Sequence, residues 1–144
     1  MSLIYNINMS KKKILIPKGL IFLVLEDTLT MREAVVNQLK KMGFSGQIFE
    51  AEKLAEAKDI IKNEKIEFII SDWNLPDGTG YDFLIEIRAN PKYSKVPFLM
   101  VTTENGIKEV IDAIKEGASN YLIKPWEEVS FIEKLLYAWE KHQD

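Results

Sequence analysis

Short apolar runs alternate with longer amphipathic segments along most of the chain. The apolar runs are rich in Ile, Leu, Val and Phe and are bounded by charges or turn residues, a pattern typical of buried strands. We expect these strands at residues 20–26, 48–51, 67–71, 97–102 and 120–123. The segments that follow them place apolar residues at helical spacing. We expect these helices at residues 30–42, 52–63, 80–89, 105–116 and 127–141.

Regular alternation of strand and helix favours the α/β class, in which a doubly wound parallel sheet carries helices on both faces. The helical spacing also predicts which side chains face the core. They are Met31, Ala34, Val35, Leu39 and Met42; Leu54, Ala57, Ile60 and Ile61; Phe83, Leu84 and Ile87; Ile107, Val110, Ile111 and Ile114; Phe131, Leu135 and Leu136.

The first residues follow neither pattern. Residues 1–13 lack clear periodicity and end in a lysine run, so we expect a mobile or loosely docked segment there. We place an N-terminal extension at 1–18 and one domain at 19–144. Because the last predicted helix ends almost at the last residue, we expect no attached effector domain.

Polar side chains stand at the carboxyl ends of four of the predicted strands. Glu26 and Asp27 follow the first strand, Asp72 follows the third, Thr102 ends the fourth and Lys124 follows the fifth. In an open α/β sheet, ligands bind outside these strand ends, so the five side chains are expected to share one crevice. Neighbouring carboxylates repel one another, and Mg²⁺, which prefers oxygen ligands, relieves that repulsion. The pattern therefore predicts a magnesium site beside a cationic amine.

Composition removes several other classes of function. The net charge is −3 with a pI near 5.3, which argues against a nucleic-acid-binding surface. The chain has no cysteine, so disulfides and thiolate metal sites are excluded. The sole histidine, His142, lies near the C-terminus, where we expect it to be solvated.

The lysine run followed by ILIPKGLIFLVL superficially resembles a secretory signal, but acidic residues and no small-residue cleavage site follow it. No apolar run approaches the roughly 20 residues needed to span a bilayer. We expect a cytoplasmic protein without a membrane partner.

With these residues in place, the chain resembles the receiver domains of two-component response regulators, and most of all the stand-alone chemotaxis type, which is CheY-like. The resemblance covers about residues 19–143 and implies a flavodoxin-like (βα)5 fold with strand order 2-1-3-4-5, the order known for flavodoxin and CheY. The segments that carry it are FLVLEDTLTMR, ISDWNLPDGTGYDFL, FLMVTTE and EGASNYLIKP.

The resemblance implies a role for each acidic residue. Asp72 is the phosphoacceptor, and its carboxylate forms an aspartyl phosphate. Mg²⁺ is held by Asp27, by Asp72 and by the main-chain carbonyl of Asn74, while Glu26 acts through water. Many relatives have Asp at the position of Glu26. Glu is one methylene longer, so we expect this difference to affect metal affinity and not metal use.

The same resemblance implies the switch. Lys124 pairs with the phosphoryl oxygens and precedes Pro125 through a cis peptide bond. Thr102 donates a hydrogen bond to the phosphoryl group, and Tyr121 changes rotamer with it. Asn74 and Glu104, each two residues beyond an active-site position, tune dephosphorylation. The residues expected to act are Asp72, Lys124, Thr102, Asn74, Glu104 and Tyr121.

The expected function is a signalling switch. A histidine kinase donates the phosphoryl group, and the face formed by the fourth helix, fifth strand and fifth helix binds a downstream target, with chemotaxis as the favoured pathway. A phosphatase partner is also considered. Catalysis is limited to self-phosphorylation and autodephosphorylation, so the chain is not expected to be an enzyme.

Alternative functions remain open at this point. The chain could serve as a phosphorelay intermediate or as the receiver fragment of a larger protein. A phosphorylation-independent adaptor is less favoured, because such receivers usually lose an acid or the lysine. A Mg²⁺-dependent phosphatase of the haloacid-dehalogenase type needs a second Asp two positions after the nucleophile, where this chain has Asn74.

Overall fold

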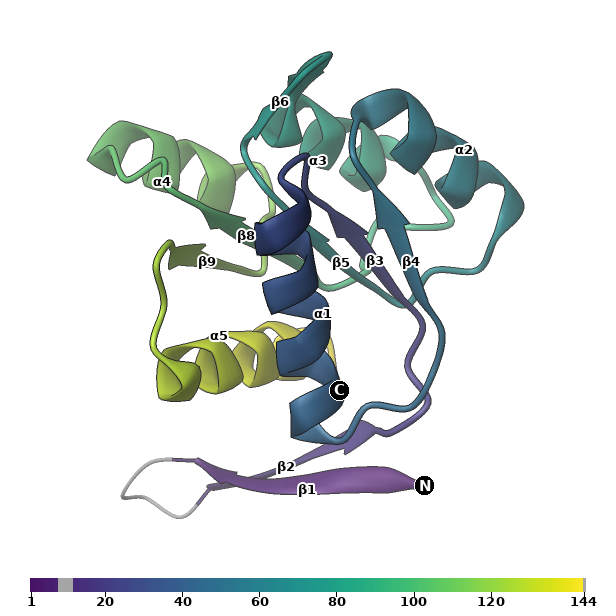
Figure 1. Cartoon of the computed structure of the whole chain (residues 1–144), viewed down its shortest axis with the longest axis vertical. Coiled ribbons are helices and arrows are strands. Elements are labelled where there is room, and N and C mark those ends of the chain that lie inside the picture. The colour runs from purple at the N-terminus through teal and green to yellow at the C-terminus, as the bar shows by residue number, and fades with distance from the viewer. Residues whose placement is uncertain (8–11, 144) are drawn as a thin grey trace.

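Five parallel strands form the central sheet of the computed structural model, which describes residues 1–7 and 12–143 (Figure 1). The strand order is β4-β3-β5-β8-β9, which is 2-1-3-4-5 in chain order and confirms the predicted topology. The strands are β3 (Phe22–Leu25), β4 (Ile48–Ala51), β5 (Phe68–Ser71), β8 (Phe98–Thr102) and β9 (Asn120–Ile123).

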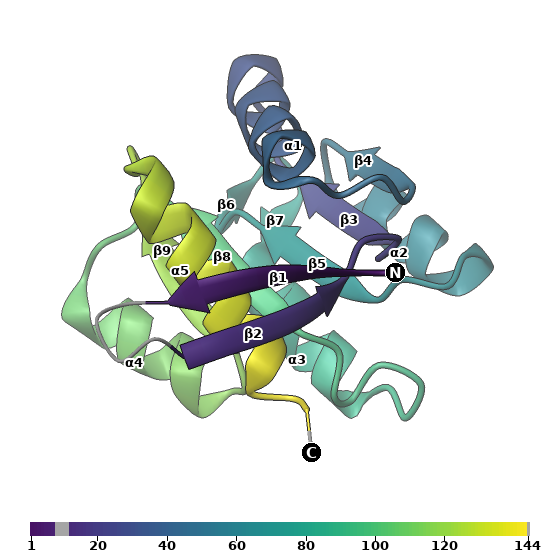
Figure 2. The ribbon, with the colours of Figure 1, turned by 90° about the horizontal axis from the view of Figure 1, so that it is seen from below.

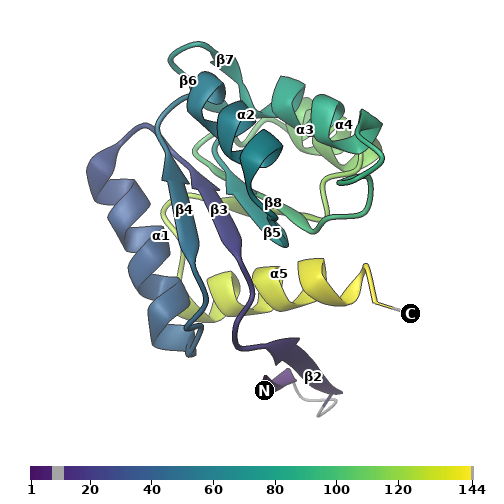
Figure 3. The ribbon, with the colours of Figure 1, turned by 90° about the vertical axis from the view of Figure 1, so that its right-hand side faces the viewer.

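Helices cover both faces of this sheet, as the alternating pattern predicted (Figures 1 and 3). One face packs on α1 and α5, with Val35, Leu39 and Phe131 in its core. The other packs mainly on α2 and α3, with Leu54 and Phe83 in its core. The helices are α1 (Leu29–Met42), α2 (Leu54–Asn63), α3 (Gly80–Ala89), α4 (Ile107–Lys115) and α5 (Glu128–Glu140).

The inner strands are apolar along their whole length because both of their faces are covered. Every residue of β3, β5 and β8 is buried. Aromatic rings join the layers: Phe22 of β3 lies 4.9 Å from Phe44 and 5.1 Å from Phe68, measured between ring centroids. The carboxyl ends of the strands therefore emerge at one edge of a sheet whose inner strands are fully buried.

The predicted inward face of α4 is wrong for three of its four residues, whereas the fourth, Val110, is partly buried against the core. Ile107, Ile111 and Ile114 are 79%, 47% and 41% exposed, and the buried residue of this helix is Ala113. The reason is the position of α4, which contacts β9 at the edge of the sheet. Only a narrow strip of the helix meets the sheet there, formed by the buried Ala113 and the partly buried Val110.

The N-terminal residues form an antiparallel hairpin of β1 (Ser2–Ile7) and β2 (Lys12–Pro17) that lies across α5 (Figure 2). Ile7, Ile14 and Ile16 are buried in the core shared with α1 and α5. The expectation of a mobile or loosely docked segment is therefore wrong for the described residues. Residues 8–11 of the predicted extension lie outside them, and the domain boundary near residue 19 stays a prediction.

Polar contacts also fasten the hairpin. The Tyr5 hydroxyl donates to the Met42 carbonyl at 2.5 Å, and Trp139 Nε1 donates to the Leu15 carbonyl at 3.1 Å. Lys12 forms an ion pair with Glu140. The sequence hid this element because the outward-facing Ile4 and Leu15 of β1 and β2 are apolar too, which obscures the alternation expected of a half-buried strand.

His142 is half-buried, and not solvated as the sequence suggested. Its Nε2 lies 2.6 Å from Ser119 Oγ, which also accepts hydrogen bonds from the Phe98 N–H at 2.9 Å and from Arg88 Nη2 at 3.4 Å. With both acceptor sites of the Ser119 hydroxyl in use, its O–H is left to donate to His142. Burial, together with the charges of Arg88 and Lys141, lowers the pKa of His142.

In the described part of the chain, no helix has the length and apolar content that crossing a membrane requires.

Truncating the hairpin core should destabilise the whole domain. Ile16→Ala should lower the free energy of unfolding by roughly 2–5 kcal/mol, the usual range for a buried Ile. Ile16 is 0% exposed, whereas its neighbour Leu15 is 59% exposed, so Leu15→Ala should stay within about 0.5 kcal/mol. Urea unfolding followed by circular dichroism measures both. Equal effects of the two substitutions would show that the hairpin is not part of the core.

His142 should make stability depend on pH. Its pKa is lower in the folded chain than the value of about 6.5 expected when unfolded. Between these values the unfolded chain binds more protons, so stability should fall as pH drops below about 6.5 towards the folded pKa. The variant His142→Asn should lose this pH-dependent part of the folding stability. Urea unfolding at a series of pH values tests it, and parallel curves for both proteins would contradict it.

Candidate functional site

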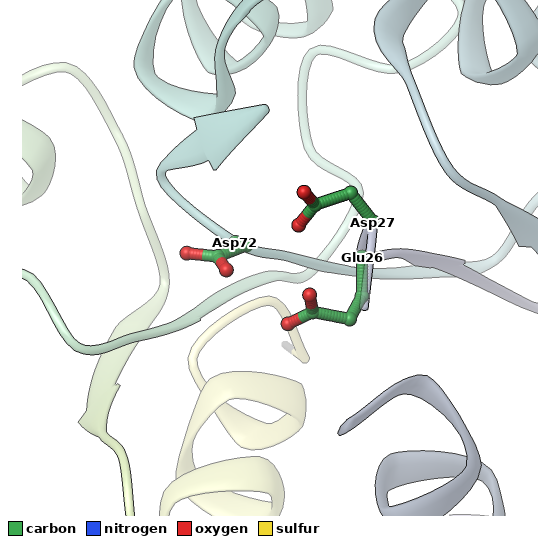
Figure 4. Close-up of side chains that lie close together, drawn as sticks. All are labelled: Glu26, Asp27 and Asp72. Carbon is green, nitrogen blue, oxygen red and sulfur yellow. The ribbon is translucent and has the colours of Figure 1, made fainter. Parts of the chain in front are cut away.

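Three carboxylates meet at the carboxyl edge of the sheet. Glu26 and Asp27 directly follow β3, and Asp72 directly follows β5. One oxygen from each side chain lies within 4.8 Å of the others. Figure 4 shows the side chains of Glu26, Asp27 and Asp72 gathered close together. Because β3 and β5 are paired in the sheet, residues that are far apart in the sequence are brought side by side here.

Lys124 lies between two of these carboxylates. Its Nζ donates to Asp72 Oδ2 at 2.9 Å and forms an ion pair with Glu26 Oε1. The side chains of Lys124, Glu26 and Asp72 are only 8%, 4% and 11% exposed. The Lys124–Pro125 peptide bond is cis, as the resemblance implied. Lys124 follows the edge strand β9, which β8 separates from the strand that leads to Asp72, so the long lysine side chain reaches across the carboxyl edge of the sheet to the acids.

Asp72 is held as a carboxylate. Burial by itself would raise its pKa, but the hydrogen bond from the Thr102 hydroxyl and the ion pair with Lys124 outweigh burial and lower the pKa. Its Oδ1 also accepts the Trp73 N–H at 2.6 Å. The two carboxylates in turn raise the pKa of Lys124 against the effect of burial. At neutral pH the pair is an ionised acid beside an ammonium.

Glu26 is engaged by protein groups on both of its oxygens. Oε1 pairs with Lys124, and Oε2 accepts the Thr28 N–H at 2.9 Å. Burial raises the pKa of Glu26 despite these partners. Its side chain therefore serves to hold the lysine in this structure.

The donor set suits a hard divalent cation. Three carboxylates face one ammonium, so the crevice carries excess negative charge, and its ligands are all oxygens. Asp27 is exposed, which leaves room for the waters that Mg²⁺ retains. Asn74 is exposed as well, and its N–H lies 3.4 Å from Asp72 Oδ1. The residues present fit magnesium.

The predicted switch residues are packed next to the acids. Thr102 is fully buried, and its Oγ1 accepts the Glu104 N–H at 3.1 Å. Tyr121 is 6% exposed, and its hydroxyl donates to the Glu104 carbonyl at 2.7 Å. Burial raises the pKa of this tyrosine. Glu104 is thus joined to Thr102 and Tyr121 through its main chain.

Sequence reasoning missed the role of Arg32. This buried arginine of α1 donates from Nη1 to the Glu26 carbonyl at 2.8 Å and pairs with Glu50 at 3.1 Å and Glu52 at 3.3 Å. It fixes the main chain that carries Glu26 and Asp27. The sequence held one signal for this role: Arg32 lies on the same helical stripe as Val35, which predicts that its side chain is buried. A buried arginine needs a partner for its charge.

Gly80 is required by a close approach of main chains. Its N–H donates to the Trp73 carbonyl at 2.7 Å, and a Cβ at this position would lie 1.9 Å from the Asp72 carbonyl oxygen. The start of α3 is therefore pressed against the segment that carries Asp72.

A pocket of about 350 Å³ opens beside Asp72. Thr28, Met31, Thr103, Lys124 and Pro125 line it with Asp72. A small anionic group can therefore reach both the carboxylate and the ammonium from solvent.

Comparison with known proteins gives one consistent family. A family model described as the response regulator receiver domain matches residues 22–136. The chemotaxis protein CheY homolog of Campylobacter jejuni is 42% identical over 114 residues, which is 78% of this chain and 87% of that protein. The curated relative CheY1 of Helicobacter pylori, a chemotaxis protein, is 38% identical over 114 residues, 78% of this chain and 91% of that protein.

A solved structure agrees. The chemotaxis response regulator CheY4 of Vibrio cholerae superposes with a TM-score of 0.72 at 27% identity, covering 87% of this chain and 99% of that one.

Adding a methyl group at Gly80 should disturb the site. Gly80→Ala should cost about 1–3 kcal/mol of folding free energy, as overpacking does, because the Asp72 main chain must move. Gly19→Ala is the matched control, since nothing lies within 4 Å of a Cβ there. Urea unfolding measures both, and an equal effect of the two changes would contradict this geometry.

Proposed function

This chain belongs to the response regulator receiver domain family, and from that membership we propose that Asp72 accepts a phosphoryl group from a histidine kinase and that the phosphorylated chain binds a downstream protein. Phosphorylation with Mg²⁺ is the family's standard chemistry. The observation that carries the proposal is the ion pair of Asp72 with Lys124, buried at the carboxyl edge of the sheet beside an open pocket.

The transfer needs an ionised carboxylate, and the lowered pKa of Asp72 supplies one at neutral pH. A carboxylate oxygen of Asp72 attacks the phosphorus of a phosphohistidine. The O–P bond forms as the P–N bond breaks, and the electron pair of that bond stays on the leaving imidazole. The Lys124 ammonium remains protonated and is placed to pair with the transferred phosphoryl oxygens.

The chain's own residues would hold the metal. Asp27, Asp72 and the main-chain carbonyl of Asn74 are the proposed ligands, with Glu26 acting through water. When bound, Mg²⁺ supplies positive charge that offsets the three carboxylates and the incoming phosphoryl group. Glu26 forms an ion pair with Lys124, so this acid links the metal side of the crevice to the lysine side.

Phosphorylation would then bias a two-state element. The hydroxyl of Thr102 is already a partner of Asp72, and its Oγ1 also accepts the Glu104 N–H. A phosphoryl group on Asp72 competes for this hydroxyl and pulls on the segment that also binds Tyr121. The proposed readout is the face of α4, β9 and α5.

Exposed apolar side chains on that face support its role in binding a partner. The exposed Ile107, Ile111 and Ile114 of α4 give a partner an apolar surface. Asn74, two residues beyond Asp72, and Glu104, on the loop that follows β8, are proposed to tune the loss of the phosphoryl group.

We place the chain in a chemotaxis pathway in the cytoplasm because the relatives named above are chemotaxis proteins. The haloacid-dehalogenase alternative is disfavoured by Asn74, which stands where those phosphatases need an acid. An adaptor independent of phosphorylation has no use for the complete set of acids and lysine that this crevice retains.

Asp72→Asn should abolish phosphorylation. With acetyl phosphate and Mg²⁺, intact-mass spectrometry should find one added phosphoryl group on the native chain and none on this variant, since the amide is not a nucleophile. Asp82→Asn, on the exposed first turn of α3, should label like the native chain. Labelling of the Asp72→Asn variant would refute the assignment, and sustained hydrolysis of general phosphomonoesters would favour a phosphatase.

A further inference from the structure

Helix α2 takes its N-terminal cap from a distant residue. The residue before the helix, Lys53, makes no side-chain cap, so the first N–H groups of α2 need other partners. The Leu54 N–H donates to Asp77 Oδ1 at 2.8 Å, and the Ala55 N–H donates to Asp77 Oδ2 at 3.0 Å. Asp77 lies in the turn between β6 (Asn74–Leu75) and β7 (Gly78–Thr79). A segment that follows the acceptor Asp72 therefore holds the start of another helix.

Packing reinforces this contact. Gly78 has a φ of +150°, and a Cβ on it would lie 2.5 Å from Leu54 Cδ1. Leu54 is itself buried in the core beneath α2. The turn is thus packed on Leu54 and hydrogen-bonded to the N–H groups of Leu54 and Ala55, the first two residues of α2. The hydrogen bond from the Leu54 N–H is the leading cause of the lowered pKa of Asp77, which is consistent with a charged cap.

The other end of the turn reaches the acidic crevice. The N–H groups of Trp73 and Asn74 both point at Asp72 Oδ1, at 2.6 Å and 3.4 Å. β6 pairs with β7, and the Gly80 N–H closes the loop on the Trp73 carbonyl. Asn74 and Asp77 therefore belong to one hydrogen-bonded turn that begins at Asp72.

A second set of contacts leads from α2 to the opposite side of the crevice. Glu52 lies just before α2, its N–H donates to Glu56 in the first turn, and its carboxylate pairs with Arg32. Arg32 in turn holds the carbonyl of Glu26. The start of α2 thus links both sides of the acidic cluster, with Asp77 supplying the link on the Asp72 side.

We propose that Asp77 is a positioning residue for the divalent cation, which fixes the spacing of the Asp72 and Asn74 ligands by fastening their loop to the N-terminus of α2. The proposal rests on the magnesium site proposed above. Asp77 is not itself a ligand. Its effect is preorganisation: a loop that is already fixed loses less conformational freedom when the cation binds, so the affinity is higher.

Isothermal titration calorimetry of the full chain with MgCl₂ tests this. Asp77→Ala should weaken Mg²⁺ binding about tenfold, the lower end of what the loss of an outer partner costs a metal site. Asp77→Asn keeps one acceptor oxygen and should lie between this variant and the native chain. Asp82→Asn removes the same charge from the first turn of α3 and should bind like the native chain, because only its main-chain N–H contacts Thr79.

Thermal unfolding without Mg²⁺ separates positioning from stability. If both Asp77 variants bind Mg²⁺ as the native chain does, the proposal is overturned, and a lowered midpoint would then mark the cap as structural only. Equal weakening by Asp77→Asn and Asp82→Asn would overturn it in favour of a charge effect. A native chain that binds no Mg²⁺ would remove the magnesium site itself, and this inference with it, before any variant is compared.

Discussion

The buried ammonium of Lys124 between Asp72 and Glu26 is the interaction on which the site depends. Burying charges is unfavourable unless they are paired with good geometry. Here the Lys124 ammonium has two carboxylate partners, Glu26 also accepts the Thr28 N–H, and Asp72 also accepts the Trp73 N–H. The sheet keeps these three groups in place because apolar layers on both of its faces fix the strands that carry them. Asp27 leaves the charge unbalanced towards the negative, and a bound cation would offset this excess for an incoming anionic phosphoryl group.

Much of this site could be predicted from the sequence, because strand ends are easy to find. The apolar runs stop where the sheet stops, so Glu26, Asp27, Asp72, Thr102 and Lys124 appeared as polar residues at their boundaries. The bounds of α3 and β9 agree with the predicted ranges. The periodicity of apolar residues and the points where apolar runs end are local properties of the sequence, so they can be recognised without knowing the tertiary structure.

The features that were missed depend on contacts between distant segments. A helical stripe shows that α4 is amphipathic, but not that its edge position leaves Ile107 and Ile111 in solvent. Nothing near His142 in the sequence indicates Ser119 as its partner. The attachment of Asp77 to α2 is equally invisible, since an aspartate in a turn ordinarily bonds to its own loop. Tertiary contacts decided each of these cases.

The hairpin of β1 and β2 gives α5 two unlike flanks (Figure 2). One flank is already occupied by the chain's own strands, through Trp139 and the buried isoleucines of the hairpin. The other adjoins β9 and stays open near Ser130 and Lys134. A macromolecule that binds α5 can therefore contact only the flank that the hairpin leaves uncovered. The hairpin thus restricts the orientation of any complex formed there, independently of the individual side chains in the contact.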